Sequence, residues 1–148
     1  MAGTFSNLTY HIVFSTSNRI PLITDGIADR LHRYIGGIVN GLGGTSLAIG
    51  GMPDHIHIVA GMPTSVAVAD VVRDVKANSS KWMNESRPES RFGWQRGYGA
   101  FTVSQSMVPS VRSNVANQRQ HHSQRSFSDE FTSLLSRHAI EFNPRYLP

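Results

Sequence analysis

The amino-acid sequence predicts an α+β fold in which an antiparallel sheet of four strands is combined with helices. The first observation is the order of the periodic segments, which follow one another as strand, helix, strand, strand, helix, strand and then helices. The second is a short connection with Gly and Pro between the second and third strands, which indicates a hairpin. This order suits the ferredoxin-like plan, with helices packed on one face of the sheet and further helices at the C-terminus.

The first strand and the first helix have the clearest patterns. Residues 9–15 are rich in aromatic and β-branched side chains, which favour strands. From Thr24 onward, apolar residues recur at steps of three and four, as in an amphipathic helix. The helix is expected to end at the cluster of Gly41, Gly43 and Gly44.

The hairpin and a second helix are expected in the middle of the chain. The two strands of the hairpin are predicted at 45–49 and 55–59, and the residues between them supply the turn. A helix begins after Thr64 or Ser65, and its apolar positions continue to Trp82.

The C-terminal half is expected to contribute the fourth strand and the remaining helices. The strand is predicted at 98–103. Pro109 suits the start of a third helix, because its missing N–H would have no helical partner there, and this helix is expected to run to Gln120 or beyond. A last helix is predicted over 128–138, followed by an extended tail over 141–148.

Length and composition indicate one globular domain covering residues 1–148. Hydrophobic residues make up 39% of the chain and charged residues 16%, which is a globular composition. The chain has no cysteine, so disulfides and thiolate metal sites are excluded and a reducing cytoplasm is the expected location. No signal peptide and no apolar run of about 20 residues is recognisable, so no membrane partner is expected.

The positive charge of the chain favours a polyanionic partner such as nucleic acid but does not by itself establish one. The formal net charge is +4, with twelve arginines and two lysines. Arginine suits phosphate because its planar guanidinium donates two hydrogen bonds at once. Many basic proteins bind no nucleic acid, so the charge supports this class of partner only together with other features.

A pair of histidines on the third predicted strand is the main candidate for chemistry. Residues two apart on a strand share a face, so His55 and His57 project side by side, while Ile56 points into a core. Two imidazoles on a rigid strand are suitable ligands for a divalent ion. The alternative is a polar strand face whose histidines bond to neighbours or water.

A third ligand is available on the predicted third helix. Asn114 and Gln118 lie four residues apart and would share one helical face. The carbonyl oxygen of Gln118 would complete a set of two nitrogens and one oxygen, which suits Mg²⁺ or Mn²⁺ and leaves positions open for a phosphate oxygen. The alternative for Gln118 is an ordinary solvated residue.

Several segments in the same order resemble the insertion-sequence-200/605 family of transposases, the HUH nucleases that use a single tyrosine. The matching segments are residues 10–16, 52–57, 94–104, 116–118, 121–122, 127–131 and 138–147. The resemblance implies a ferredoxin-like catalytic domain, usually a homodimer, that acts on single-stranded DNA with hairpin ends. It also implies that His55, His57 and Gln118 hold the metal, which polarises the scissile phosphate for attack by a tyrosine and formation of a 5′-phosphotyrosine.

The chain departs from the family at the nucleophile. The family's tyrosine lies four residues before the glutamine, and Asn114 occupies that position. An amide has no ionisable hydroxyl and forms no phosphoester of this kind. Ser113 faces about 100° away on a helix and Ser110 lies about 6 Å along the axis, so neither replaces the tyrosine well. Tyr98 is the least unsuitable of the four tyrosines by position.

Further residues are candidates for DNA contact because of their charge or their place in the matching segments. They are Arg96, Tyr98, Arg112, Arg119, His121 and His122. Phe92 and Trp94 lie among arginines, where they would either stack on bases or belong to the core.

Three functions are compatible with the sequence. The first is a metal-dependent transposase for single-stranded DNA, impaired in cleavage by Asn114. The second is a domesticated relative that binds a DNA hairpin without cleaving it. The third is an RNA-binding module on a similar sheet, against which the absence of the RRM aromatic signature counts.

Overall fold

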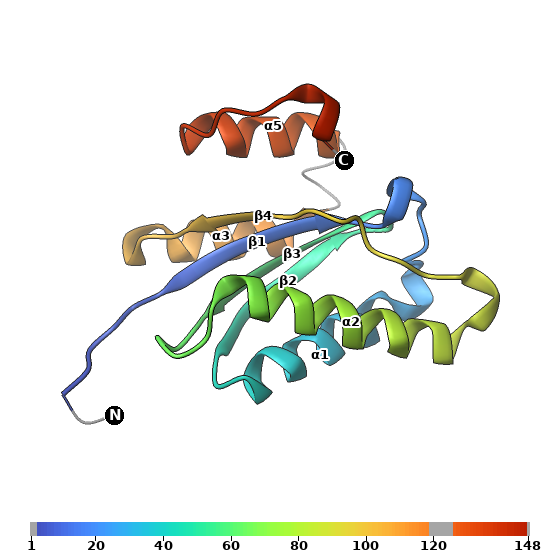
Figure 1. Ribbon diagram of the computed structural model, residues 1–148, viewed down its shortest axis with the longest axis horizontal. Helices are drawn as coiled ribbons and strands as arrows, with labels where there is room; N and C mark the ends of the chain where they lie inside the picture. Colours follow the sequence, from blue (N-terminus) through green and yellow to red (C-terminus); the bar gives the residue numbers. More distant parts are fainter. Residues whose placement is uncertain (1–2, 119–125, 148) are drawn as a thin grey trace.

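The computed structural model describes residues 3–118 and 126–147 and contains a four-stranded antiparallel sheet. The strands are β1 (Thr9–Ser15), β2 (Thr45–Met52), β3 (His55–Gly61) and β4 (Gly99–Thr102). Their order across the sheet is β2-β3-β1-β4, so the two central strands are β3 and β1 (Figure 1). This is the ferredoxin-like arrangement, and the predicted fold class is confirmed.

Two helices cover one face of the sheet, as the sequence predicts. They are α1 (Asp25–Gly41) and α2 (Val68–Ser86), which lie together on the lower side in Figure 1. The main apolar core fills the space between them and the sheet. Its fully buried members include Ile12, Phe14, Ile27, Leu31, Ile35, Ile56, Ile58 and Val75.

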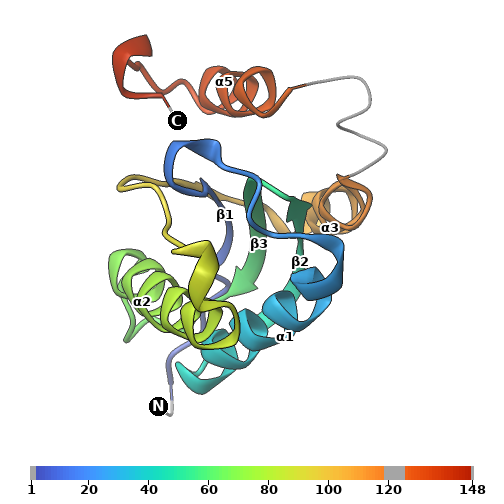
Figure 2. The ribbon, with the colours of Figure 1, turned by 90° about the vertical axis from the view of Figure 1, so that its right-hand side faces the viewer.

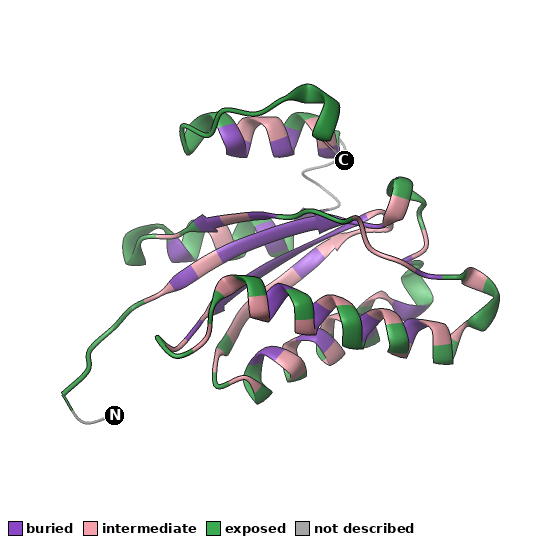
Figure 3. Ribbon diagram, viewed as in Figure 1, coloured by how far each residue is buried: buried purple, intermediate pink, exposed green. Residues whose placement is uncertain are grey.

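The C-terminal helices α3 (Val108–Ala116) and α5 (Phe127–Arg137) lie on the opposite face. In Figure 2 the sheet is seen between α1 and α2 on one side and α5 on the other, with α3 beside β2. Figure 3 shows buried residues on the side of α5 toward the sheet and the exposed C-terminal tail running along its far side. A second, smaller apolar cluster joins α5 to β1 and β4 through Val13, Phe101, Phe131 and Leu134.

The third helix ends earlier than the sequence predicts. It contains Pro109 in its first turn but stops at Ala116, and Asn117 has non-helical backbone angles of φ −105° and ψ 33°. The prediction of one continuous helix through Gln118 is therefore wrong. Local sequence gives no clear signal for this break, because neither Gly nor Pro follows Val115.

The other differences concern boundaries. Both strands of the hairpin extend further than expected, and the tail contains a 3₁₀ turn at Pro144–Tyr146 in place of a wholly extended segment. Three more 3₁₀ turns lie at Ser17–Arg19, Pro88–Ser90 and Gln105–Met107. Among the described residues, no helix has both the length and the apolar character that crossing a membrane requires.

Candidate metal centre

The two histidines of β3 lie side by side on the face of the sheet that α5 covers. In the antiparallel register, His57 is opposite Val13 and His55 is opposite Ser15, both on β1. Each histidine is only 1% exposed, and their ring centroids lie 5.1 Å apart. The alternation of strand side chains therefore brings both imidazoles to one buried site, as the sequence predicts.

The carboxylate of Asp54 fixes the orientation of His55. Nδ1 of His55 lies 2.8 Å from Oδ1 of Asp54, and this hydrogen bond, above all, holds the pKa of Asp54 below its usual value. The bond leaves Nε2 of His55 directed toward Gln118, whose Oε1 is 3.4 Å away. A carboxylate on the far nitrogen of a histidine is a common support for a metal ligand, because it fixes the tautomer and makes the ligating nitrogen more basic.

His57 is held by a third histidine, which comes from the neighbouring strand β1. Nε2 of His11, on β1, lies 2.8 Å from Nδ1 of His57, and the two rings are stacked. Burial and, secondly, the positive charge of a protonated His57 lower the pKa of His11 to about 3. His11 is therefore neutral at pH 7, and its Nε2 accepts the hydrogen that Nδ1 of His57 donates if Nε2 of His57 is to serve as a ligand.

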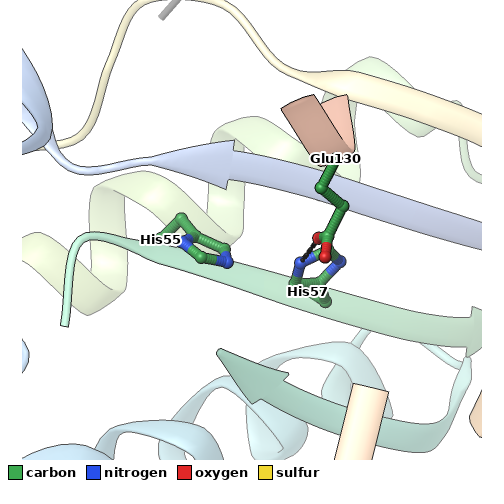
Figure 4. A group of neighbouring side chains, drawn as sticks. All are labelled: His55, His57 and Glu130. Carbon is green, nitrogen blue, oxygen red and sulfur yellow. Dashed lines mark ion pairs between the residues drawn. The ribbon is translucent and has the colours of Figure 1, made fainter. Parts of the chain in front are cut away.

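Glu130 of α5 is the functional candidate that sequence reasoning missed. Its Oε1 lies 2.6 Å from Nε2 of His57 (Figure 4), and its side chain is buried. A signal for it exists in the sequence. The apolar stripe of α5 consists of Phe127, Phe131, Leu134 and Leu135, and Glu130 occupies a position within that stripe where an apolar residue is expected.

Gln118 reaches the site although the helix before it has ended. The side chain is 4% exposed, and its Nε2 donates to the backbone oxygen of Asn114 at 3.1 Å. This bond turns the amide oxygen toward His55. Gly50 of β2 permits this placement, because a Cβ there would collide with the backbone oxygen of Val115 at the end of α3.

A cavity of about 530 Å³ opens beside these residues. His57, Gln118 and Glu130 line it, together with Asn114, which is exposed. Ser110 and Ser113 are not among the described residues that line it. Asn114 thus lines the same cavity as His57, Gln118 and Glu130, and its side chain is an amide.

Tyr98 lies on the other side of the sheet. Its ring is 5.7 Å from Nζ of Lys76, a residue of α2, and Lys76 also donates to the backbone oxygens of Gln95 and Gly97 at 2.8 and 2.7 Å. Tyr98 is not among the residues that line the cavity beside His57, so its position gives no support for it as a replacement nucleophile. Its exposed ring remains a candidate for DNA contact elsewhere on the surface.

The remaining candidates for DNA contact are either exposed, part of the core, or outside the described residues. Arg96 precedes β4 and Arg112 lies on α3, and both are exposed. Arg119, His121 and His122 lie outside the described residues. Phe92 is buried and Trp94 packs edge to face on Phe14, so these two aromatic residues belong to the core.

The donor atoms of the site fit a divalent cation. Among the described residues, His55, His57 and Glu130 each offer a ligand atom, and these atoms lie within 4.8 Å of one another. The amide oxygen of Gln118 adjoins them. Two imidazole nitrogens with two oxygens are a mixed set that suits borderline and hard ions such as Mn²⁺ and Mg²⁺.

The comparison with known protein families decides what kind of protein carries this centre. Residues 4–118 match the family described as transposase, IS200 like. The chain belongs to this transposase family. The matched region includes β1, the histidine pair on β3 and Gln118, whereas Glu130 follows it.

Two relatives of the transposase come from Deinococcus radiodurans. The ISDra2 transposase TnpA is 26% identical over 124 residues, which cover 78% of this chain and 87% of the relative. A crystal structure assigned as a transposase of strain R1 is 25% identical with a TM-score of 0.66, covering 80% of this chain and 95% of the other.

A third similarity concerns the fold alone. A REP-associated tyrosine transposase, solved with a bound REP hairpin, has a TM-score of 0.52 and 15% sequence identity to this chain. The match covers 78% of this chain and 68% of the other. Together the three comparisons agree with the fold and the family that the sequence predicts.

Proposed function

We propose that this transposase binds single-stranded DNA with hairpin ends through a centre for Mg²⁺ or Mn²⁺, and that its strand cleavage is impaired. The observation that carries the proposal is the convergence of His55, His57 and Gln118 beside a cavity that also contains Asn114. The first three would be the metal ligands. Asn114 occupies the place of the attacking tyrosine.

The side chains of the site prepare it for a phosphate group. When bound, the metal supplies Lewis-acid stabilisation of negative charge on the scissile phosphate. Asp54 and His11 keep the two ligand nitrogens directed into the site, and the face of α5 excludes water from one side. The exposed Arg112 on α3 is a candidate for contact with the DNA backbone, as are Arg119, His121 and His122 in the segment that follows.

Asn114 determines which step is impaired. Cleavage in this class of chemistry needs an oxygen that attacks phosphorus and then holds the strand covalently. A carboxamide oxygen is a poor nucleophile, and its nitrogen is not basic. Binding of DNA and metal does not require the hydroxyl, so both are expected to remain.

The same observation supports a second candidate, a domesticated protein of this fold that recognises a hairpin and does not cleave it. The two candidates share the metal and the DNA partner and differ only in covalent chemistry. A homodimer is proposed for both, following the resemblance to the family.

A covalent-adduct assay on labelled single-stranded DNA tests the proposal. The protein is incubated with a hairpin-tipped strand and Mg²⁺ or Mn²⁺, and complexes are resolved by gel shift and by denaturing electrophoresis. We expect a metal-dependent gel shift and no adduct from the natural chain. Asn114→Tyr is expected to form an adduct, and Asn114→Phe is the control with a ring and no hydroxyl.

The possible results separate the candidates. A strong adduct from the unaltered chain would contradict the impaired site and require another nucleophile. No adduct from Asn114→Tyr, with DNA binding intact, would favour the non-cleaving candidate. Metal-dependent binding that persists in His55→Ala would contradict the assignment of the centre.

A further inference from the structure

Glu130 is an unusual residue for the buried face of a helix. It is 5% exposed, and the other buried residues of α5 are the apolar Phe127, Phe131, Leu134 and Leu135. Carboxylates are rarely buried unless they are paired or bind a metal, because removal from water is costly. The position therefore calls for a specific partner.

The partner atom in the structure is the one that matters for metal binding. Nδ1 of His57 is engaged by His11, so Nε2 is the nitrogen left to serve as a ligand. The carboxylate oxygen of Glu130 lies 2.6 Å from that Nε2. It also belongs to the group of ligand atoms that includes His55, within 4.8 Å of one another.

We propose that Glu130 is a fourth ligand of the metal centre, and that the bound metal thereby fastens α5 to the sheet. The inference rests on the proposed function, because it assumes the centre formed by His55, His57 and Gln118. It adds a ligand from a helix that follows the segment matched to the family, since the match ends at residue 118.

The charge of the ligand set supports this role. His55, His57 and Gln118 are neutral as ligands, so a dication bound by them alone would keep its full charge in a buried site. A carboxylate compensates half of that charge, and it is the oxygen ligand that Mg²⁺ and Mn²⁺ prefer. Four protein ligands in an octahedral site leave two positions for oxygens of water or phosphate.

The position of Glu130 on its helix also favours the charged form. It lies in the first turn of α5, after the N-cap Ser126, whose Oγ accepts from the backbone N–H of Asp129 at 3.1 Å. The positive end of the helix dipole stabilises a carboxylate there. The residue thus joins a helix end to the histidine of β3.

The alternative role for Glu130 is that of a competitor, which would occupy Nε2 of His57 and exclude the metal. The two roles predict opposite effects of one substitution. Removing the charge of a ligand weakens metal binding, whereas removing a competitor strengthens it.

The experiment is a titration of the metal-free full chain with Mn²⁺, together with hydrogen exchange of residues 127–137 with and without Mn²⁺. The variants are Glu130→Gln, which keeps the size and removes the charge, and Glu130→Asp, which keeps the charge. Asp129→Asn is the matched control, because it removes an exposed carboxylate from the same helical turn.

We expect Glu130→Gln to weaken Mn²⁺ binding about 10-fold or more, since outer-shell changes alone cost that much at metal sites. Glu130→Asp should retain tighter binding than Glu130→Gln, and Asp129→Asn should bind like the natural chain. Mn²⁺ should slow exchange in α5 of the natural chain, and this protection should be lost in Glu130→Gln. The protection in the natural chain is a readout that does not depend on how well a variant folds.

Equal or tighter Mn²⁺ binding by Glu130→Gln would overturn the inference, as would exchange in α5 that Mn²⁺ does not change. The result for His55→Ala separates this failure from that of the proposed function. If His55→Ala abolishes binding and Glu130→Gln does not, the centre stands without its fourth ligand. If the natural chain binds no Mn²⁺, both proposals fall.

Discussion

The two faces of the central strands have opposite compositions although their residues alternate along the same backbone. Ile56 and Ile58 of β3 pack into the core between the sheet and helices α1 and α2, whereas His55 and His57, which alternate with them, face α5. β1 follows the same rule, with Ile12 on the apolar face and His11 on the polar face. One face of these strands thus contributes only to the main core, whereas the other carries the candidate metal ligands beside the smaller apolar cluster.

The two faces differ in how much their buried side chains stabilise the fold. Burying apolar side chains is favourable without any further condition. Burying His11, His57 and Glu130 removes polar groups from water, and their hydrogen bonds and ion pairs only partly offset this. On our proposal, a metal bound there adds to the stabilisation of the polar face.

The largest expected effect comes from breaking the pair on the polar face. His57→Leu leaves the carboxylate of Glu130 buried beside an apolar side chain, and we expect the free energy of unfolding without metal to fall by about 3–5 kcal/mol. The double variant His57→Leu/Glu130→Leu replaces both charged partners with apolar groups and should recover most of that loss, while Nε2 of His11 still lacks its bond to His57. Urea unfolding in EDTA measures both. A double variant as unstable as the single one would show that the pair is not the source of the loss.

A similar loss is expected on the apolar face, but without a rescue by a partner. Ile56 is fully buried, and Ile56→Ala should lower the free energy of unfolding by about 2–5 kcal/mol through lost burial and the cavity that remains. The difference in the free energy of unfolding between Ile56→Ala and the natural chain should be the same in the absence of metal and at saturating Mn²⁺. A loss below about 1 kcal/mol would contradict the assignment of this face to the main core.

Substitution of His11 is expected to weaken metal binding through its effect on His57. His11→Gln removes the ring that fixes Nδ1 of His57, and we expect Mn²⁺ binding to weaken about 10- to 100-fold. Calorimetric titration measures the affinity, and His32→Gln serves as a control on α1. Unchanged affinity in a folded His11→Gln variant would mean that His57 is oriented without it.

The smallest expected effect concerns pH. Burial lowers the pKa of His32, which lies on α1 in the layer that covers the apolar face, against a smaller opposing effect of Asp29. The unfolded chain therefore binds a proton near pH 6.5 that the folded chain takes up only at lower pH, and stability falls as the pH decreases below about 6.5. His32→Gln should make this decrease shallower in thermal unfolding between pH 7 and 5. An unchanged slope would show that His32 does not contribute to it.

The sequence was sufficient to predict the parts of the site that belong to one strand. Strand periodicity alone places His55 and His57 on one face with Ile56 opposite, and the order of elements is enough for the ferredoxin-like sheet. Gln118 was reached by resemblance to the family, and the structure brings its amide to His55.

The parts that could not be predicted depend on packing between elements. His11 meets His57 only because β1 and β3 are neighbours in a particular register, and 46 residues separate the two. Glu130 reaches His57 only because α5 packs on that face of the sheet. The end of α3 before Gln118 has no local sequence signal, and it lies where the helix packs closely on Gly50 of β2.

The central claim is that the polar face of the sheet is a metal centre. A crystal of the full chain grown with Mn²⁺ and measured at a wavelength where manganese scatters anomalously tests it most directly. The account predicts one anomalous peak bonded to Nε2 of His55 and Nε2 of His57, with oxygens of Gln118 and Glu130 beside it. A peak elsewhere, or no peak at saturating Mn²⁺ with the site otherwise ordered, would contradict it.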